Sequence, residues 1–423
     1  MDTHFKILLK NGFMILYLVL LFAMLKESLT LIFSLLNKGE LLVNWKNGNL
    51  EFADFILYYM SGQLASGKDA HSIYDPAMQL KYFNQLISPG TVPKPFFMQS
   101  VPFTFVLVIP LIWLPIAQSY IAWFVVTTVF GAVSAFLWYR LFGSGTISSL
   151  IAICSTAASY PAMIGMRMGQ QCWNIMGLVS LYFYSLYKRW DFLCGFLLSI
   201  ISFKPHYALF CALPPLFNRR WKVIVVAALT EVSLLVMAGC FVGFENVLNY
   251  PAIVLHADST SDFFGVNPHK MISMRLLCTL FLPEKIAMSS GFLIMLLGLL
   301  ALSAIWFWTI KGGFKTAWEQ RWALVLTVLL CIVASPHTHS YDLAMLAPCA
   351  FTIIAREGRG SDESKTLVFR AWRLILIVYP LLTWLLIWTA SLSISLPFVG
   401  MLLINTVLTI LAFLLWRRQV AQR

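Results

Sequence analysis

Long apolar runs separated by short polar stretches extend along the whole chain. They occur near residues 12–36, 101–139, 147–166, 172–187, 191–217, 221–243, 288–310, 322–335, 340–355, 367–393 and 396–416. A helix needs roughly 20 apolar residues to cross a bilayer, and most of the runs approach or exceed that length. The pattern predicts an all-α, multi-pass transmembrane helical bundle of about ten to twelve spans, with residues 1–423 forming a single polytopic membrane domain.

The composition supports this class. Hydrophobic residues make up 60% of the 423 residues and charged residues 11%, whereas soluble domains carry about 25% charged residues. We see no soluble domain between the runs and no nucleic-acid-binding fold. The eight cysteines lie in or beside apolar segments, and none is spaced as Cys-x-x-Cys. They predict neither a disulfide framework nor a metal site, and nothing in the sequence calls for a cofactor.

Basic residues indicate the orientation, because cytoplasmic loops are enriched in Lys and Arg. The basic clusters are residues 218–222, 311–321 and 356–365 and the C-terminal tail. With these segments in the cytoplasm, the loops 37–100, 244–287 and 336–341 face outward. The net charge of +12 is then mainly an orientation signal and a contact with anionic membrane lipids.

Residues 101–118 leave two topologies open, because they contain three prolines. If they span the membrane, Arg140 and Lys188 face outward. If they re-enter, those residues face inward, Gln170 faces outward, and Lys204–Pro205 must mark a second broken helix. Charge slightly favours re-entry, but two broken helices make it the costlier arrangement, so we expect a span.

The first outward loop predicts two helices at the membrane interface. Residues 51–64 read as an amphipathic helix that ends before Gly67. Asp75–Pro76 is an N-terminal signal for a second helix through Gln85. Since long loops usually have a function, these helices suggest a platform at the membrane surface.

Asp54 is the first candidate for chemistry. A carboxylate at the mouth of a membrane cavity can take a proton from a sugar hydroxyl, and burial would raise its pKa toward the working pH. Tyr58 follows one helical turn later and partly shares the same face. The alternative is that Asp54 only caps or solvates an interfacial helix.

Lys204 and His206 lie in the stretch "SFKPHYAL", inside the apolar run 191–217. Charges within spans are rare and usually face a cavity, and Pro205 would kink the helix there. Lys204 could bind a phosphate as a point charge, or it could snorkel to one interface.

Further polar candidates cluster in three places. The turn "SPHTHSYD" holds His337, His339, Tyr341 and Asp342. These residues could contact a sugar or a phosphate, or they could form a polar hairpin in which Asp342 caps the next helix. They could also bind a metal, although two histidines separated by one residue in a turn are a weak signal for a zinc site. Other candidates lie on the segment after residue 168 and at the end of the second outward loop: Gln170, Asn174, His269 and Lys270. Glu231 lies within a span and should pair with a polar group.

Five stretches, taken together and in order, resemble a known family. They are "DFILYYMSGQLASGKDAHSIYDP", "VPFTFVLVIPLIWLPIAQSYIAW", "MGQQCWNIMGL", "CGFLLSIISFKPHYALFCALPPLFNRRWK" and "ASPHTHSYDLAMLAP". The chain is similar to the integral-membrane glycosyltransferases of family 87, which have the GT-C fold. One departure is "MQSVPF", where family members often have Tyr-Pro-Pro.

The resemblance implies an activity and its site. It implies a polyprenyl-phosphate sugar donor carrying mannose or a similar hexose or pentose, and a lipid-linked or glycan acceptor. Transfer would occur with inversion and without a required metal, on the extracytoplasmic side of the bacterial inner (plasma) membrane. It also implies that Asp54 is the general base and that Gln170, Lys204 and the turn 335–342 line the cavity.

Two other functions are compatible with a polytopic protein. A transporter or flippase of lipid-linked sugars would need inverted repeats with broken helices in matching positions, and we find no internal repeat. A lipid-binding scaffold would not require Lys204 in mid-membrane.

Overall fold

The computed structural model describes most of the chain as helices joined by turns. The described residues are 53–94, 96–142, 159–259, 268–346, 366–389, 392–393 and 395–422, with six single positions between 15 and 30. Most of the predicted span 12–36, the end of the predicted span 340–355 and the basic segment 356–365 lie outside them.

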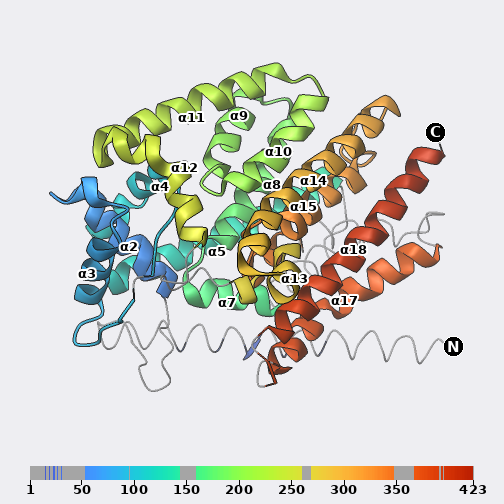
Figure 1. Cartoon of the computed structure of the whole chain (residues 1–423). Helices are drawn as coiled ribbons and strands as arrows, with labels where there is room; N and C mark the ends of the chain where they lie inside the picture. Colours follow the sequence, from blue (N-terminus) through green and yellow to red (C-terminus); the bar gives the residue numbers. More distant parts are fainter. Residues whose placement is uncertain are drawn as a thin grey trace.

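The all-α prediction is confirmed for the described residues (Figure 1). The α-helices are α2 (Ala53–Ser66), α3 (Pro76–Leu86), α4 (Pro102–Leu107), α5 (Ile116–Phe142), α7 (Tyr160–Met168), α8 (Cys172–Lys188), α9 (Asp191–Ile201), α10 (Pro205–Phe217), α11 (Trp221–Val242), α12 (Phe244–Ser259), α13 (Met274–Phe281), α14 (Glu284–Lys311), α15 (Arg321–Ala334), α17 (Leu367–Trp388) and α18 (Leu396–Ala421). Short 3-10 helices are η2 (Ala70–Ser72), η3 (Ile109–Trp113), η4 (Pro268–Lys270) and η5 (Ser340–Met345).

Several of these helices are long and apolar enough to cross a membrane. Within the described residues there are four, namely Ile116–Phe142, Trp221–Val242, Ser289–Lys311 and Leu396–Ala421, or five if the bent pair within α17 is one span. The multi-pass bundle is therefore confirmed. The described helices nevertheless give fewer full-length spans than the apolar runs suggested, because runs such as 191–217 and 322–335 fold as shorter helices.

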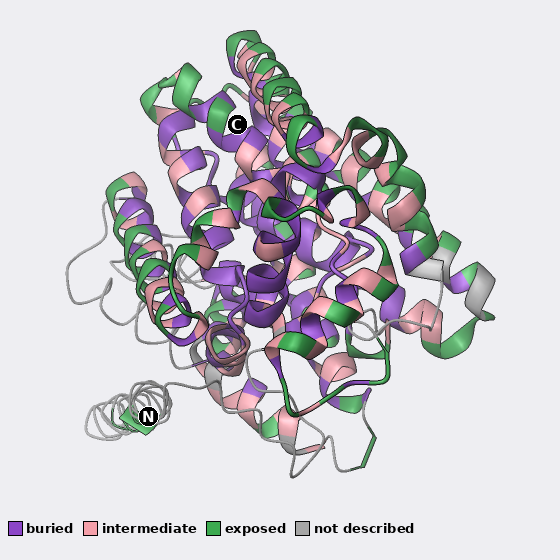
Figure 2. Cartoon of the chain, turned by 90° about the vertical axis from the view of Figure 1, so that its left-hand side faces the viewer, coloured by how far each residue is buried: buried purple, intermediate pink, exposed green. Residues whose placement is uncertain are grey.

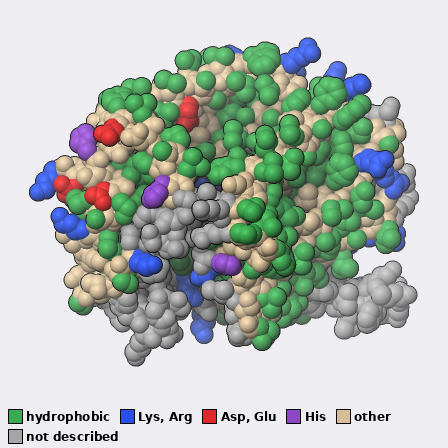
Figure 3. Space-filling view, in the orientation of Figure 1, with side chains coloured by type: hydrophobic (Ala, Val, Ile, Leu, Met, Phe, Trp, Pro, Cys, Tyr) green, Lys and Arg blue, Asp and Glu red, His purple; other side chains and the backbone are tan. Residues whose placement is uncertain are grey.

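The outer faces of the bundle are apolar, as a lipid environment requires. Figure 2 shows buried residues in the middle of the bundle and exposed ones on its outer helices. On α11 the exposed positions are themselves hydrophobic, with Val225 and Leu229 exposed by 56% and 64%. In Figure 3, hydrophobic side chains cover much of the visible side, and charged side chains gather toward its ends.

The two helices predicted in the first outward loop are present, but α2 is not amphipathic. Asp75 caps α3 as expected, its side chain accepting the Ala77 N–H at 2.9 Å. Helix α2, in contrast, is buried around most of its circumference, with Phe55, Ile56 and Met60 fully covered. It packs against α3, α4 and η3 instead of floating on the bilayer surface.

The structure does not support the expected span at residues 101–118. The segment folds as α4 and η3, of six and five residues, which together fall well short of the roughly 30 Å of a hydrocarbon core. A second break follows, as the re-entrant topology requires: α9 ends at Ile201 and α10 begins at Pro205. Both apolar runs are long enough to span, but their prolines interrupt the helix. Each proline lacks a backbone N–H donor and favours the first turn of a new helix.

The basic loops meet at one end of the bundle, where α11 begins and α14 and α18 end (Figure 1). An Arg220 guanidinium N–H donates to the Leu186 carbonyl at 2.9 Å, and Gln419 Nε2 donates to the Glu319 carbonyl at 2.8 Å. Tyr187 also hydrogen-bonds Gln320. The end of α8 thus lies beside the predicted cytoplasmic loops, as re-entry of residues 101–118 demands.

Candidate functional site

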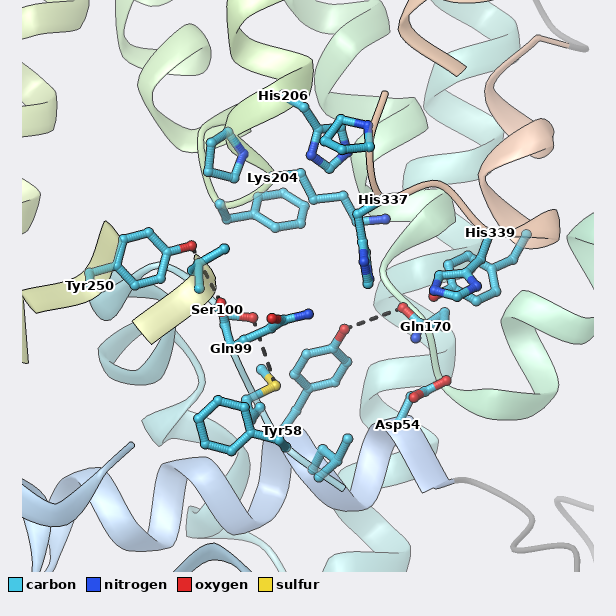
Figure 4. A pocket seen from close by; sticks show the side chains of 18 of the residues that line it. Asp54, Tyr58, Gln99, Ser100, Gln170, Lys204, His206, Tyr250, His337 and His339 are labelled. Atoms are coloured by element: carbon cyan, nitrogen blue, oxygen red, sulfur yellow. Dashed lines mark hydrogen bonds between the residues drawn. The ribbon is translucent and has the colours of Figure 1, made fainter. Parts of the chain in front are cut away.

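A cavity of about 300 Å³ lies at the other end of the bundle, away from the basic loops. Its walls come from α2, the strap of residues 96–100, the break between α9 and α10, helices α12 and α14, and the turn 336–341 (Figure 4). Polar side chains line one part and apolar ones another. Eight of the predicted site residues line it: Asp54, Tyr58, Gln170, Lys204, His206, His337, His339 and Tyr341.

Asp54 and Tyr58 reach the cavity from the first two turns of α2. The Tyr58 hydroxyl donates to Gln170 Oε1 at 3.3 Å, and the Gln170 side chain also hydrogen-bonds to the Asp54 carboxylate. Figure 4 shows Asp54 and Tyr58 on the same side of the cavity, with Gln170 above them. The three side chains form one hydrogen-bonded group.

Gly169 is what brings Gln170 to α2. It ends α7 with φ +72°, a left-handed conformation that favours glycine. A Cβ at this position would lie 2.5 Å from the Phe55 Cβ, so no larger residue fits without a shift. The Gly169 carbonyl also accepts the Trp123 indole N–H at 2.9 Å. The close contact fixes the next residue beside Asp54.

Burial raises the pKa of Asp54 to about 6, from an ordinary value of 3.8. The hydrogen bond from Gln170 and the positive charge of Lys204 favour the carboxylate and limit the rise. A carboxyl group with this pKa is ionised at neutral pH and still basic enough to accept a proton.

Lys204 does not snorkel to an interface. It precedes the first residue of α10, and its Nζ pairs with Asp342 Oδ1 at 2.6 Å. Asp342 is buried, and its Oδ2 accepts the His339 N–H at 3.0 Å at the start of η5. Asp342 therefore caps η5, the simpler of the roles considered for it, and does not itself line the cavity.

His337 and His339 face the cavity from the turn before η5. Their ring centroids lie 4.9 Å apart, edge to face. Burial lowers the pKa of both imidazoles, that of His339 to about 4. Both rings are neutral at physiological pH, so they offer hydrogen bonds and not positive charge. In the described parts of the chain, no three His, Cys, Asp or Glu side chains converge as metal ligands would.

The remaining predicted residues do not line the cavity. Asn174 is buried in the first turn of α8. His269 and Lys270 lie in η4, where the His269 ring is 3.4 Å from the Ser395 hydroxyl and Lys270 is exposed. The end of the second loop instead supports the turn 335–342, because the Ile272 N–H donates a hydrogen bond to the Thr338 carbonyl at 2.9 Å.

Sequence reasoning missed three polar residues of the cavity wall. Gln99 and Ser100 lie on the strap, and Tyr250 reaches in from α12. A signal was present, because the polar pair Gln99–Ser100 interrupts an apolar stretch just before Pro102.

Comparison with known families gives a finding that agrees with this geometry. A sequence model of glycosyltransferase family 87 matches residues 101–336, more than half of the chain. The chain belongs to glycosyltransferase family 87. The resemblance inferred from its motifs is confirmed, and the protein is a membrane glycosyltransferase. A comparison with curated proteins finds no match.

The matched residues cover only part of the cavity wall. Gln170 and Lys204 lie inside the matched segment, whereas His337 follows it and Asp54 precedes it. The placement of Asp54 in the site therefore rests on the tertiary structure.

Proposed function

We propose that this glycosyltransferase uses a polyprenyl-phosphate sugar as donor, transfers the sugar to a lipid-linked or glycan hydroxyl with inversion, and works on the extracytoplasmic side of a bacterial plasma membrane. The observation that carries the proposal is Asp54, a half-buried carboxylate on the cavity wall with its pKa raised to about 6.

In the proposed step, the acceptor hydroxyl gives its proton to the Asp54 carboxylate as its oxygen bonds to the anomeric carbon. The bond from that carbon to the phosphate oxygen breaks, and the electron pair leaves with the polyprenyl phosphate. A single displacement inverts the anomeric configuration and needs one base. Among the described lining residues, Asp54 is the carboxylate that can serve.

Lys204 is the candidate partner for the departing phosphate, because its side chain lines the cavity and is 18% exposed. Its ion pair with Asp342 holds the ammonium group in place before the donor binds. Preorganised charge of this kind stabilises the transition state without reorganisation during the reaction.

The apolar part of the cavity suits the lipid tail of such a donor. Leu209 of α10 and Phe292 of α14 both line the cavity, and they are also 47% and 37% exposed on the apolar outside of the bundle. A cavity wall that continues onto the lipid-facing surface lets a polyprenyl chain enter from the bilayer, with its phosphate toward Lys204.

The decisive experiment replaces Asp54 with Asn in the full-length protein in proteoliposomes, given a panel of polyprenyl-phosphate sugars. Asn keeps the size of Asp and caps a helix about as well, but it cannot accept the proton. We expect transfer to fall roughly 10²–10⁴-fold, the usual contribution of a general base, while donor binding and thermal stability stay near the parent.

Activity of the Asn variant within a few-fold of the parent would remove Asp54 from the role of base. A protein that moved the donor across the membrane without consuming it would instead be a flippase. Asp262 of the second loop, another outward carboxylate, lies outside the described residues.

A further inference from the structure

The strap of residues 96–100 has its backbone held from two sides. The Tyr74 hydroxyl donates to the Ser100 carbonyl at 2.5 Å, and the Tyr250 hydroxyl of α12 donates to the Gln99 carbonyl at 3.3 Å. These bonds fix the path of the strap along the cavity wall.

A buried glutamine of α3 completes the support. Gln79 accepts the Met98 N–H at 2.8 Å and donates to the Met98 carbonyl at 3.3 Å, while its amide also donates to the Ile73 carbonyl at 2.7 Å. The backbone of the strap is therefore positioned by other residues. The side chain of Gln99 is not used to hold it.

That side chain points into the cavity (Figure 4). Gln99 Oε1 is buried and has no hydrogen-bond partner among the described residues. The same holds for His206 Nε2 on the facing wall. An unpartnered buried polar atom costs free energy, so its presence on the wall of a cavity points to a ligand that satisfies it.

The chemistry of the amide identifies the ligand group. A buried acceptor needs a donor, and a phosphate diester at neutral pH offers only acceptors. A hydroxyl group can donate to Gln99 Oε1 and thereby satisfy it. Figure 4 places Gln99 beside Tyr58, one helical turn from Asp54.

We infer that Gln99 is a specificity-determining residue that hydrogen-bonds a hydroxyl group of the donor's sugar, not its phosphate or lipid. The inference rests on the proposed function, because it takes the occupant of the cavity to be a glycosylated polyprenyl phosphate.

The test is a binding measurement on the full-length protein in lipid nanodiscs. The probes are polyprenyl-phosphate mannose, its analogues that each lack one ring hydroxyl, and polyprenyl phosphate without a sugar. Gln99→Met keeps the length of the side chain and removes its polar atoms. Gln85→Met, at an exposed position of α3, is the matched control.

We expect the parent protein to bind one deoxy analogue roughly tenfold more weakly than the complete donor, the size of one good hydrogen bond. The Gln99→Met variant should bind the complete donor more weakly than the parent, by a similar factor. It should bind that deoxy analogue with the same affinity as the parent. Its affinity for polyprenyl phosphate should not change, and Gln85→Met should match the parent throughout.

Three results would overturn the inference. They are equal binding of all the analogues by the parent, equal weakening of every probe by Gln99→Met, or weaker binding of polyprenyl phosphate by that variant. The comparison of the analogues on the parent protein does not depend on the folding of any variant. If the parent binds neither polyprenyl-phosphate mannose nor any other sugar of the polyprenyl-phosphate panel, the proposed function is rejected, and this inference with it.

Discussion

At the scale of single residues, two carboxylates near the cavity differ in role because their surroundings differ. Asp342 is 1% exposed and is engaged by Lys204 and by the backbone of η5. Asp54 is half-buried, has one amide partner and carries a raised pKa. Of these two carboxylates, Asp54 is the one that lines the cavity, so it has the access to take a proton from a substrate.

The raised pKa predicts the pH dependence of the reaction. A general base acts in its ionised form, so activity should be constant above about pH 7 and fall as the pH drops through about 6, where Asp54 is half protonated. An unshifted carboxyl would lose activity only near its ordinary pKa of 3.8. Rates of transfer between about pH 4 and 8, at saturating donor, measure this directly.

The matched control is the same profile for Asp54→Asn. Its residual activity should not fall through the same acidic range, because the titrating group has been removed. A fall with an apparent pKa near 6 in both proteins would assign the titration to another group.

At the scale of secondary-structure elements, the site depends on helices that stop early. Helix α9 ends at Ile201 and α10 begins at Pro205, and Lys204 lies at the break, where its side chain lines the cavity and pairs with Asp342. Ser199 in the last turn of α9 and Ser202 directly after the helix donate to Glu231 Oε2 of α11 at 3.0 and 2.6 Å. The pairing expected for this intramembrane carboxylate thus supports the end of α9.

The ion pair across this break predicts how Lys204 variants behave. Lys204→Met alone leaves the Asp342 carboxylate buried without its partner, which should cost about 3–5 kcal/mol of stability. The double variant Lys204→Met with Asp342→Asn removes both charges and should recover most of that loss. Thermal unfolding in detergent measures both effects.

Donor binding separates the structural part of Lys204 from its proposed contact with phosphate. The double variant should fold well and still bind polyprenyl phosphate weakly. Binding as tight as that of the parent would restrict Lys204 to holding η5 and α10 together.

At the scale of the whole molecule, the two ends of the bundle have different chemistry. One end gathers the basic loops 218–222 and 311–321 with the C-terminal tail (Figure 1). None of the residues that line the cavity comes from these segments. The positive-inside rule assigns the basic end to the cytoplasm. In the proposed orientation the cavity therefore faces the extracytoplasmic side.

This orientation predicts which single cysteines react with an impermeant reagent in intact cells. Ser66→Cys at the end of α2 and Lys315→Cys after α14 are both exposed positions. In a background without the exposed Cys240, the reagent should label position 66 and miss position 315 until the cells are lysed. The reverse pattern would put the cavity in the cytoplasm and exclude the proposed sidedness.

The amino-acid sequence alone indicated the class of the protein and many of the residues that line the candidate site. Apolar runs of bilayer length predict a helical membrane bundle whatever the three-dimensional arrangement of the helices. Charged and polar residues inside such runs, as at Lys204 and in the turn 335–342, point to a cavity because lipid does not tolerate them. These signals are local, so they can be found without knowing the fold.

The fold of residues 101–118 and the partner of Lys204 could be learned only from the three-dimensional structure. Residues 101–118 form two short helices, α4 and η3, that pack against α2, and no local pattern records that packing. The pair of Lys204 with Asp342 joins residues 138 positions apart. The polar pair Gln99–Ser100 is visible in the sequence, but the contacts of a single side chain depend on the fold, so only the structure shows that Gln99 lines the cavity and that its buried Oε1 has no hydrogen-bond partner among the described residues.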